Sequence, residues 1–219
     1  MNGEKILIFD LDDTIFETRS IGTHHLKEVF NQFRVLAAEY YSSGTLKKIE
    51  EELWHYPFDQ VASTYEFPEA LSKLFSRLIT ETEFRFNIQP FIDFEHVRNL
   101  DLRKKLVTSG FRHLQEAKIT ALGIASVFEE VIIDAIDAQD RIFKLGIFKK
   151  ILSESGLRNQ DHIVIGDNPH SELKAGNELG FTTVQVGKLG QPCSQYSDYY
   201  ITDFRQLHSL INDAETKSF

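Results

Sequence analysis

A short apolar run near the start of the chain ends in a cluster of carboxylates. The segment Ile6–Phe9 is followed by Asp10, Asp12 and Asp13. Four consecutive apolar residues bounded by charge predict a strand that is buried on both faces, as in a parallel sheet. Open α/β sheets bind their ligands at the carboxyl ends of such strands. Carboxylates this close repel one another, so we expect a divalent cation among them, the alternative being an acidic turn that faces solvent.

Two further apolar runs, within residues 106–110 and 162–167, also end in polar residues. If the three strands are parallel neighbours, their tips converge and bring together carboxylates, hydroxyl groups, backbone N–H groups and one ammonium group. The residues concerned are Asp10, Asp12, Thr108, Ser109, Gly110, Lys144, Asp167 and Glu172. A metal, a nucleophile and a cation near the phosphate are what phosphoryl transfer requires.

Four motifs in this order resemble those of the haloacid dehalogenase superfamily. They are Asp10-x-Asp12-x-Thr14, Thr108 after its strand, Lys144, and Gly166-Asp167 followed by Glu172. The resemblance covers residues 4–17 and about 90–212. On these motifs the chain is identified as a member of the phosphatase branch, which implies a phosphoric monoester hydrolase.

The resemblance implies four catalytic residues. Asp10 would be the nucleophile that forms an aspartyl-phosphate, and Asp12 would be the general acid and base. Thr108, Lys144 and the N–H groups of Ser109 and Gly110 would hold the phosphoryl oxygens. For Ser109 and Gly110 the alternative is a helix N-cap, although a helix N-terminus can itself bind an anion.

The resemblance also implies Mg²⁺ as the cofactor, with Asp10, Asp12, Asp167 and Glu172 around it. Asp12 would contribute its backbone carbonyl. The chain departs from the family pattern at three positions: Lys144 is not followed by proline, Glu172 stands where Asp is commoner, and Asp13 replaces a common glycine. With its extra methylene group, Glu172 would either bind the metal directly or orient a water molecule bound to it.

Between the first two motifs the sequence changes from short strands to helical periodicity. Three apolar stripes with steps of three and four residues, starting at Leu26, Leu46 and Ala70, predict three helices. After residue 90, helices that end at glycine alternate with short strands, which predicts βαβ units in a parallel sheet. We therefore expect a doubly wound, Rossmann-like α/β core over residues 1–16 and 88–219. Residues 17–87 would form an inserted α-helical cap, as in one subclass of the resembling family.

Composition excludes several classes of partner. The net charge of −9 gives no basic footprint for nucleic acid or an anionic membrane. The chain shows no signal-peptide pattern and no apolar run long enough to span a bilayer, and its single cysteine, Cys193, allows no internal disulfide. These features predict a cytoplasmic protein whose partner is a small phosphate ester, and they leave the oligomeric state open.

The predicted function is a Mg²⁺-dependent phosphatase acting on a small phosphorylated metabolite. Two alternatives remain: a sugar phosphomutase of the same superfamily, and a non-catalytic binding or regulatory protein on this core. Mutases of the family carry a histidine soon after the first motif, but His24 and His25 miss its spacing by about two residues. The cap would select the substrate, and Phe16, Thr18 and His24 are its residues nearest in sequence to the nucleophile.

Overall fold

The described residues fold around a parallel sheet of six strands in the order β3-β2-β1-β4-β5-β6. The structure is a computed structural model that describes residues 4–187 and 192–216. The strands are β1 (Ile6–Phe9), β2 (Arg103–Gly110), β3 (Glu130–Ala135), β4 (His162–Gly166), β5 (Thr182–Val186) and β6 (Tyr199–Ile201). The predicted α/β class with a doubly wound parallel sheet is confirmed.

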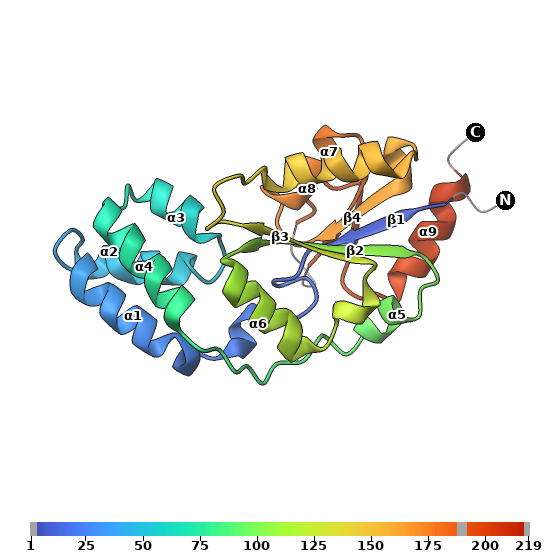
Figure 1. Ribbon diagram of the computed structural model, residues 1–219. Coiled ribbons are helices and arrows are strands. Elements are labelled where there is room, and N and C mark those ends of the chain that lie inside the picture. Colours follow the sequence, from blue (N-terminus) through green and yellow to red (C-terminus); the bar gives the residue numbers. More distant parts are fainter. Residues whose placement is uncertain (1–3, 188–191, 217–219) are drawn as a thin grey trace.

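Helices cover both faces of the sheet, as Figure 1 shows. One face carries α5 (Phe94–Arg98), α6 (Arg112–Leu122) and α9 (Gln206–Thr216), and the other carries α7 (Phe143–Ser155) and α8 (Glu172–Glu178). Alternate residues of β1 point to opposite faces: Leu7 and Phe9 join the apolar cluster under α5, α6 and α9, and Ile6 and Ile8 join the cluster under α7 and α8. All four are almost completely buried, so the apolar run that opens the sequence anchors both layers.

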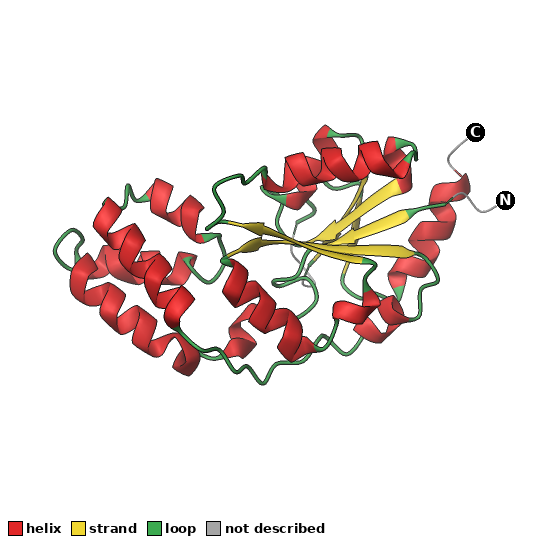
Figure 2. Ribbon diagram, in the orientation of Figure 1, coloured by secondary structure: helices red, strands yellow, loops and turns green. Residues whose placement is uncertain are grey.

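A group of helices lies between β1 and β2 and forms a separate lobe (Figures 1 and 2). It comprises the short helix η1 (Thr18–Ile21), α1 (Thr23–Ala37), α2 (Ser43–Glu52), α3 (Phe58–Thr64) and α4 (Glu69–Glu81). These helices pack around a second apolar cluster, which includes Phe33, Ile49, Leu71 and Phe75 and is shared with Phe111 of the α/β part. Two further short helices, η2 (Ala125–Val127) and η3 (Asn159–Asp161), lie in the α/β part.

The helical lobe differs from expectation in two short elements. Three helices were expected, and the structure adds η1, of 4 residues, and α3, which begins after Pro57 and spans only 7 residues. The two chain segments that join the lobe to the sheet run together, because the N–H of Phe91 donates to the carbonyl of Ile15 at 2.8 Å. Within residues 4–187 and 192–216, no helix has the length and apolarity needed to cross a membrane.

Candidate active site

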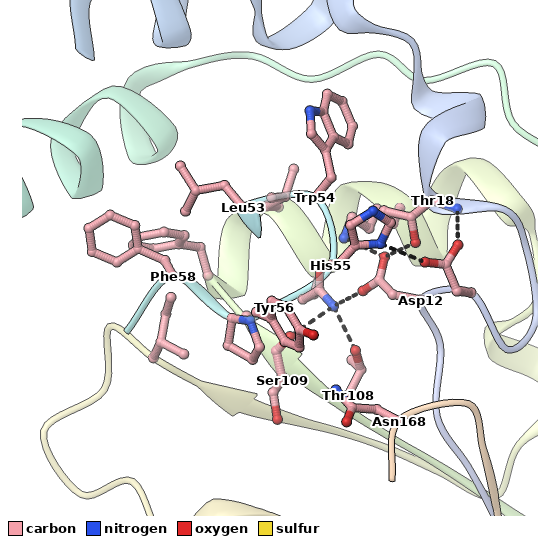
Figure 3. Close-up of a pocket in the computed structure, with 18 of the residues that line it drawn as sticks. Asp12, Thr18, Leu53, Trp54, His55, Tyr56, Phe58, Thr108, Ser109 and Asn168 are labelled. Carbon is pink, nitrogen blue, oxygen red and sulfur yellow. Dashed lines mark hydrogen bonds and ion pairs between the residues drawn. The ribbon is translucent and has the colours of Figure 1, made fainter. Parts of the chain in front are cut away.

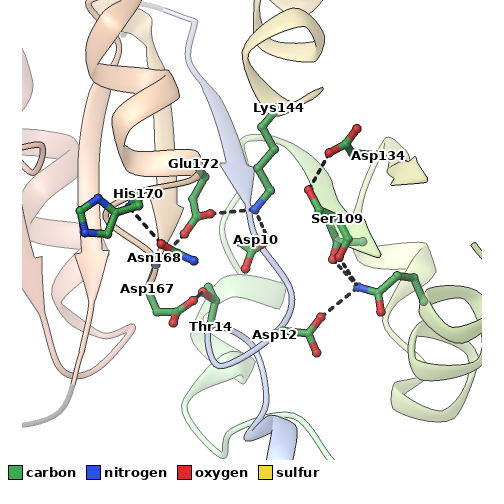
Figure 4. Close-up of polar contacts among 12 residues, drawn as sticks. Asp10, Asp12, Thr14, Ser109, Asp134, Lys144, Asp167, Asn168, His170 and Glu172 are labelled. Atoms are coloured by element: carbon green, nitrogen blue, oxygen red, sulfur yellow. Dashed lines mark hydrogen bonds and ion pairs between the residues drawn. The ribbon is translucent and has the colours of Figure 1, made fainter. Parts of the chain in front are cut away.

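The strand register brings the carboxyl ends of β1, β2 and β4, where three of the four motifs lie, to one edge of the sheet. Phe9 pairs with Leu106 on one side and with Ile165 on the other. Asp10 therefore leaves the sheet beside Thr108 and Asp167, and its N–H still donates to the carbonyl of Ile165 at 2.9 Å. Figure 4 shows Asp10 between Lys144 and Asp167, with Asp12 pointing toward α6.

Lys144 links two of the carboxylates. Its Nζ donates to Oδ1 of Asp10 and to Oε2 of Glu172, both at 2.7 Å. Burial alone lowers the pKa of Lys144, but the charges of Asp10 and Glu172 outweigh it and hold that pKa above its ordinary value. The side chain is therefore a buried ammonium group placed beside the nucleophile proposed from the motifs.

The acidic cluster carries more negative charge than Lys144 neutralises. Carboxylate oxygens of Asp10, Asp167 and Glu172 all lie within 4.8 Å of one another. Burial raises the pKa of Asp10 to about 7, with Glu172 and Asp12 adding to the effect and Lys144 opposing it. Burial and the charges of Glu172 and Asp10 likewise raise the pKa of Asp167 well above its usual value. Three oxygen donors with an excess of negative charge fit a divalent cation such as Mg²⁺.

Glu172 is held tightly at the first residue of α8. Its Oε1 accepts the N–H of Asn168 at 2.7 Å, while Oε2 accepts from Lys144. The side chain passes so close to Gly166 that a Cβ there would lie 2.4 Å from it, so residue 166 must be glycine. Asp167 is positioned independently, by the hydroxyl of Thr14 at 3.1 Å.

Asp12 is held by residues of α6 that the motifs did not predict. Lys118 Nζ donates to Oδ1 of Asp12 at 2.7 Å, and Gln115 Nε2 donates to Oδ2 at 2.9 Å. Thr18 adds a bond to Oδ1 at 3.3 Å. Gln115 and Lys118 are both buried and share the inward face of α6 with Ile119 and Leu122. The sequence signal that could have predicted these two residues is their polar character at core-facing positions of a helix.

The end of β2 contributes Thr108, Ser109 and Gly110, which all line the same cavity. The Thr108 hydroxyl accepts from Gln115 Nε2 at 2.6 Å, which leaves its proton free to donate to a phosphoryl oxygen. The Ser109 hydroxyl instead donates to Asp134 at 2.8 Å. The N-cap alternative for Ser109 and Gly110 is wrong, because β2 continues to Gly110 and α6 begins at Arg112.

The residues expected to reach the leaving group are not all at the site. Thr18 lines the cavity, but Phe16 is completely buried in the apolar layer under α5, α6 and α9. His24 is exposed and stacks against His25, whose ring packs against Phe86. Among the described residues that line the cavity, neither Phe16 nor His24 is found. The expectation for these two residues is wrong, because the Phe16 side chain turns into the core and the His24 side chain faces solvent, whereas Leu26 of the same turn of α1 lines the cavity.

A cavity of about 140 Å³ joins the strand tips to the helical lobe. Asp10, Asp12, Lys144 and Glu172 line one end. Figure 3 shows the other end, where residues 53–58, between α2 and α3, lean over the tip of β2. A ligand in this cavity would contact both parts of the molecule.

Fold and site together define the class. A doubly wound α/β sheet, an acidic cluster at the strand tips and a buried lysine beside it describe a phosphoryl-transfer enzyme. The model of the haloacid dehalogenase-like hydrolase family matches residues 7–186, and the chain belongs to that family. The resemblance stated from the four motifs is thereby confirmed.

Curated relatives place the chain in the phosphatase branch as a phosphoric monoester hydrolase. The glyceraldehyde 3-phosphate phosphatase of Pyrococcus furiosus is 23% identical over 233 residues, which cover 94% of this chain and 92% of that protein. The enzyme of the same name from Methanocaldococcus jannaschii is 28% identical over 125 residues, about half of either chain (53% and 52%). The N-acylneuraminate-9-phosphatase of Mus musculus is 22% identical, with 97% and 96% covered.

Solved structures show the same fold at low identity. The HAD-hydrolase YfnB of Bacillus subtilis, in a form bound to magnesium, superposes with a TM-score of 0.67 at 18% identity and covers 95% of this chain and 99% of its own. The HAD phosphatase of Thermococcus onnurineus gives a TM-score of 0.62 at 18% identity, with 94% and 97% covered.

Proposed function

We propose that this protein is a Mg²⁺-dependent phosphatase that hydrolyses a small phosphorylated metabolite through an aspartyl-phosphate on Asp10. The observation that carries the proposal is the cluster of Asp10, Asp167 and Glu172, whose oxygens lie within 4.8 Å of one another, with the ammonium group of Lys144 donating to Asp10 and Glu172. Three carboxylates beside one ammonium group leave an excess of negative charge that a divalent cation balances.

In the first step a carboxylate oxygen of Asp10 forms a bond to phosphorus while the ester P–O bond breaks. Asp12 gives a proton to the departing alcohol oxygen. Lys144, the Thr108 hydroxyl and the N–H groups of Ser109 and Gly110 hold the three remaining phosphoryl oxygens, where charge must be balanced.

In the second step Asp12 takes a proton from water, and the water oxygen attacks phosphorus. The bond to Asp10 breaks, and inorganic phosphate leaves. Asp10, Asp167, Glu172 and the backbone carbonyl of Asp12 would surround a bound Mg²⁺, which supplies positive charge to the phosphoryl group. Glu172 already accepts from Lys144 and Asn168, which favours a role in holding Lys144 and a metal-bound water over direct ligation.

The helical lobe is proposed as the cap, over residues 17–87. The apolar cluster that holds its helices together and its two joining segments, bonded together at Ile15 and Phe91, support a lobe that moves as a unit over the strand tips. Closure would exclude water from the site. The exposed position of His24 gives no support to the mutase alternative, which needs a histidine at the phosphoryl group.

The test is phosphate release from p-nitrophenyl phosphate by the full chain, with Mg²⁺ or with excess chelator. We expect turnover with Mg²⁺ only, and loss of turnover in Asp10→Asn. Asp101→Asn is the matched control, because Asp101 is exposed just before β2, at the opposite end of the sheet. Full activity in chelator or in Asp10→Asn would refute the proposal.

A further inference from the structure

The two ends of the cavity differ sharply in chemistry. At the strand tips the lining is made of carboxylates, hydroxyl groups and ammonium groups. Toward the helical lobe it is mostly apolar, with the polar groups of His55 and Tyr56 beside Leu26, Phe30, Leu53, Trp54, Phe58 and Phe75. A phosphate ester that binds with its phosphate at the tips therefore places its organic part among apolar side chains.

The apolar end is a built wall of aromatic rings. The ring of Phe58 stacks on that of Phe75, with centroids 4.6 Å apart and planes 9° apart. Phe111, at the start of α6, lies 5.4 Å from Phe58 and joins the wall to the α/β part. The ring centroid of Phe30 lies 6.3 Å from that of Phe75 and 6.1 Å from that of Trp54. Rings packed against one another in this way form a surface that exists before any ligand arrives.

The cavity offers no cation to a second anionic group. Among the described residues that line it, the ammonium groups belong to Lys118 and Lys144, and both already donate to carboxylates. The imidazole of His55 lies 3.9 Å from the carboxylate of Asp13. A carboxylate or a second phosphate on the organic part would meet apolar rings, the Tyr56 hydroxyl and the Asp13 carboxylate, and no ammonium group of a described lining residue is left to compensate for its lost hydration.

We infer that the substrate is a phosphate monoester whose organic part is uncharged and apolar, and no larger than about one aromatic ring. The inference rests on the proposed phosphatase function and adds the class of leaving group to it. The cavity sets this upper limit, because its volume of about 140 Å³ must hold the phosphate as well as the organic part, and an apolar cavity of roughly 150 Å³ accommodates one benzene ring. The stacked rings favour a flat group, which can lie against Phe58.

The first test compares alkyl phosphates with the full chain and Mg²⁺. Benzyl phosphate, glycerol 1-phosphate, glyceraldehyde 3-phosphate and 2-phosphoglycolate all release an alcohol, so the chemical step is similar and the organic part differs. We expect kcat/KM for benzyl phosphate to exceed that of each of the others by about tenfold or more, from the apolar surface that the ring buries. Equal or higher kcat/KM for any of the other three would overturn the inference while leaving the phosphatase function intact.

The second test measures binding without hydrolysis. Benzylphosphonate and methylphosphonate carry the same anionic group and differ only in the ring. We expect the dissociation constant of benzylphosphonate, measured by calorimetry with Mg²⁺ present, to be at least tenfold lower. Equal affinities would overturn the inference. If no ester is turned over, the proposed function fails, and this comparison still decides whether the apolar wall binds a ring.

The third test changes the wall itself. Leu53→Asn puts a polar amide in the lining, and Val35→Asn makes the same kind of change at an exposed position on α1, outside the cavity. We expect Leu53→Asn to lower the benzyl-to-glycerol ratio of kcat/KM by about fivefold or more, and Val35→Asn to leave it unchanged. The conservative Leu53→Met is expected to keep the ratio. A ratio that falls equally in both Asn variants, or in neither, would contradict the inference.

Discussion

The strand tips and the helical lobe line the same cavity with side chains of opposite chemistry. At the tips, the buried groups are charged, and side-chain donors hold the carboxylates, as Lys144 holds Asp10 and Glu172. In the lobe, the lining is apolar and the rings contact one another. The difference teaches that the proposed phosphate site and the proposed site for the organic group are built mostly from different segments of chain, which meet where Phe111 follows Gly110, so most of their residues can be changed separately.

The two regions meet through an apolar contact, in which Phe111 packs against Phe58 and Phe75 of the lobe, and through several polar contacts. Thr18 of the lobe donates to Asp12, and His55 faces Asp13. Arg141, just before α7, forms an ion pair with Asp59 of α3 and also holds Asp134 at 2.7 Å. If the separation is real, substitutions at the tips change turnover for every ester, and substitutions in the lobe change the ranking of esters.

The largest effect is expected at the nucleophile. Asp10→Asn should lower kcat by about 10³-fold or more for every phosphate ester, because an amide is a poor nucleophile and adds no charge for the metal. The melting temperature without metal should not fall, since one carboxylate leaves a repulsive cluster. Kinetics and thermal unfolding of the same preparation check both points. A loss of activity that parallels a loss of folded protein would contradict the assignment.

A smaller effect on turnover is expected at Lys118. This residue would position Asp12, and Lys118→Met should lower kcat by roughly tenfold, below the roughly 10²–10⁴-fold expected for Asp12→Asn. The two changes share one interaction, so Lys118→Met should add little in the Asp12→Asn background. Steady-state kinetics of both single variants and the double variant measure this coupling. Multiplicative losses would show that Lys118 acts independently of Asp12.

Metal binding should change stability with a defined dependence on pH. Burial raises the pKa of Asp10 in the folded protein from 3.8, the value of an exposed aspartate, to about 7. Between these two pH values the folded protein therefore holds a proton on Asp10 that the unfolded chain has released. Stability of the metal-free protein therefore falls as pH rises from about 4 to about 7. Added Mg²⁺ should raise the melting temperature by about 2–4 °C or more at pH 8, and by less at pH 5. An equal gain at both pH values, or the same difference in Asp10→Asn, would argue against this cause.

Much of the α/β part could be predicted because its signals are local. The apolar run Ile6–Phe9 and the alternation of short strands with glycine-ended helices are each visible within a few residues, and together they predict a parallel sheet. The order of the four motifs also predicted which strand tips meet, and the register of β1, β2 and β4 places them together. Residue roles at these tips stay predictions until the variants are measured.

The parts that escaped prediction depend on contacts distant in sequence. Helix α3 has 7 residues, too few to show a periodicity, and it is stabilised by packing of Phe58 on Phe75. Lys118 lies 106 residues from Asp12, so the local sequence around either residue does not predict their ion pair. Phe16 lies close to the nucleophile in sequence but turns into the core, since closeness along the chain does not fix the direction of a side chain.

The smallest effect is expected at the ion pair that joins the two regions. Asp59 is 40% exposed, so its pairing with Arg141 should stabilise the fold by about 1 kcal/mol or less. Asp59→Asn should nevertheless loosen α3, and with it Phe58, and so raise KM for benzyl phosphate by a few-fold while kcat stays within about twofold. Glu69→Gln is the matched control, because Glu69 pairs with Lys73 inside α4 and touches no core residue through that bond. Measured kcat and KM for benzyl phosphate and glycerol 1-phosphate distinguish an effect on binding of the organic part from an effect on the phosphate site. A fall of kcat for both esters in Asp59→Asn alone would mean that the lobe, through Arg141, Asp134 and Ser109, also shapes the phosphate site, and the separation of the two regions would be incomplete.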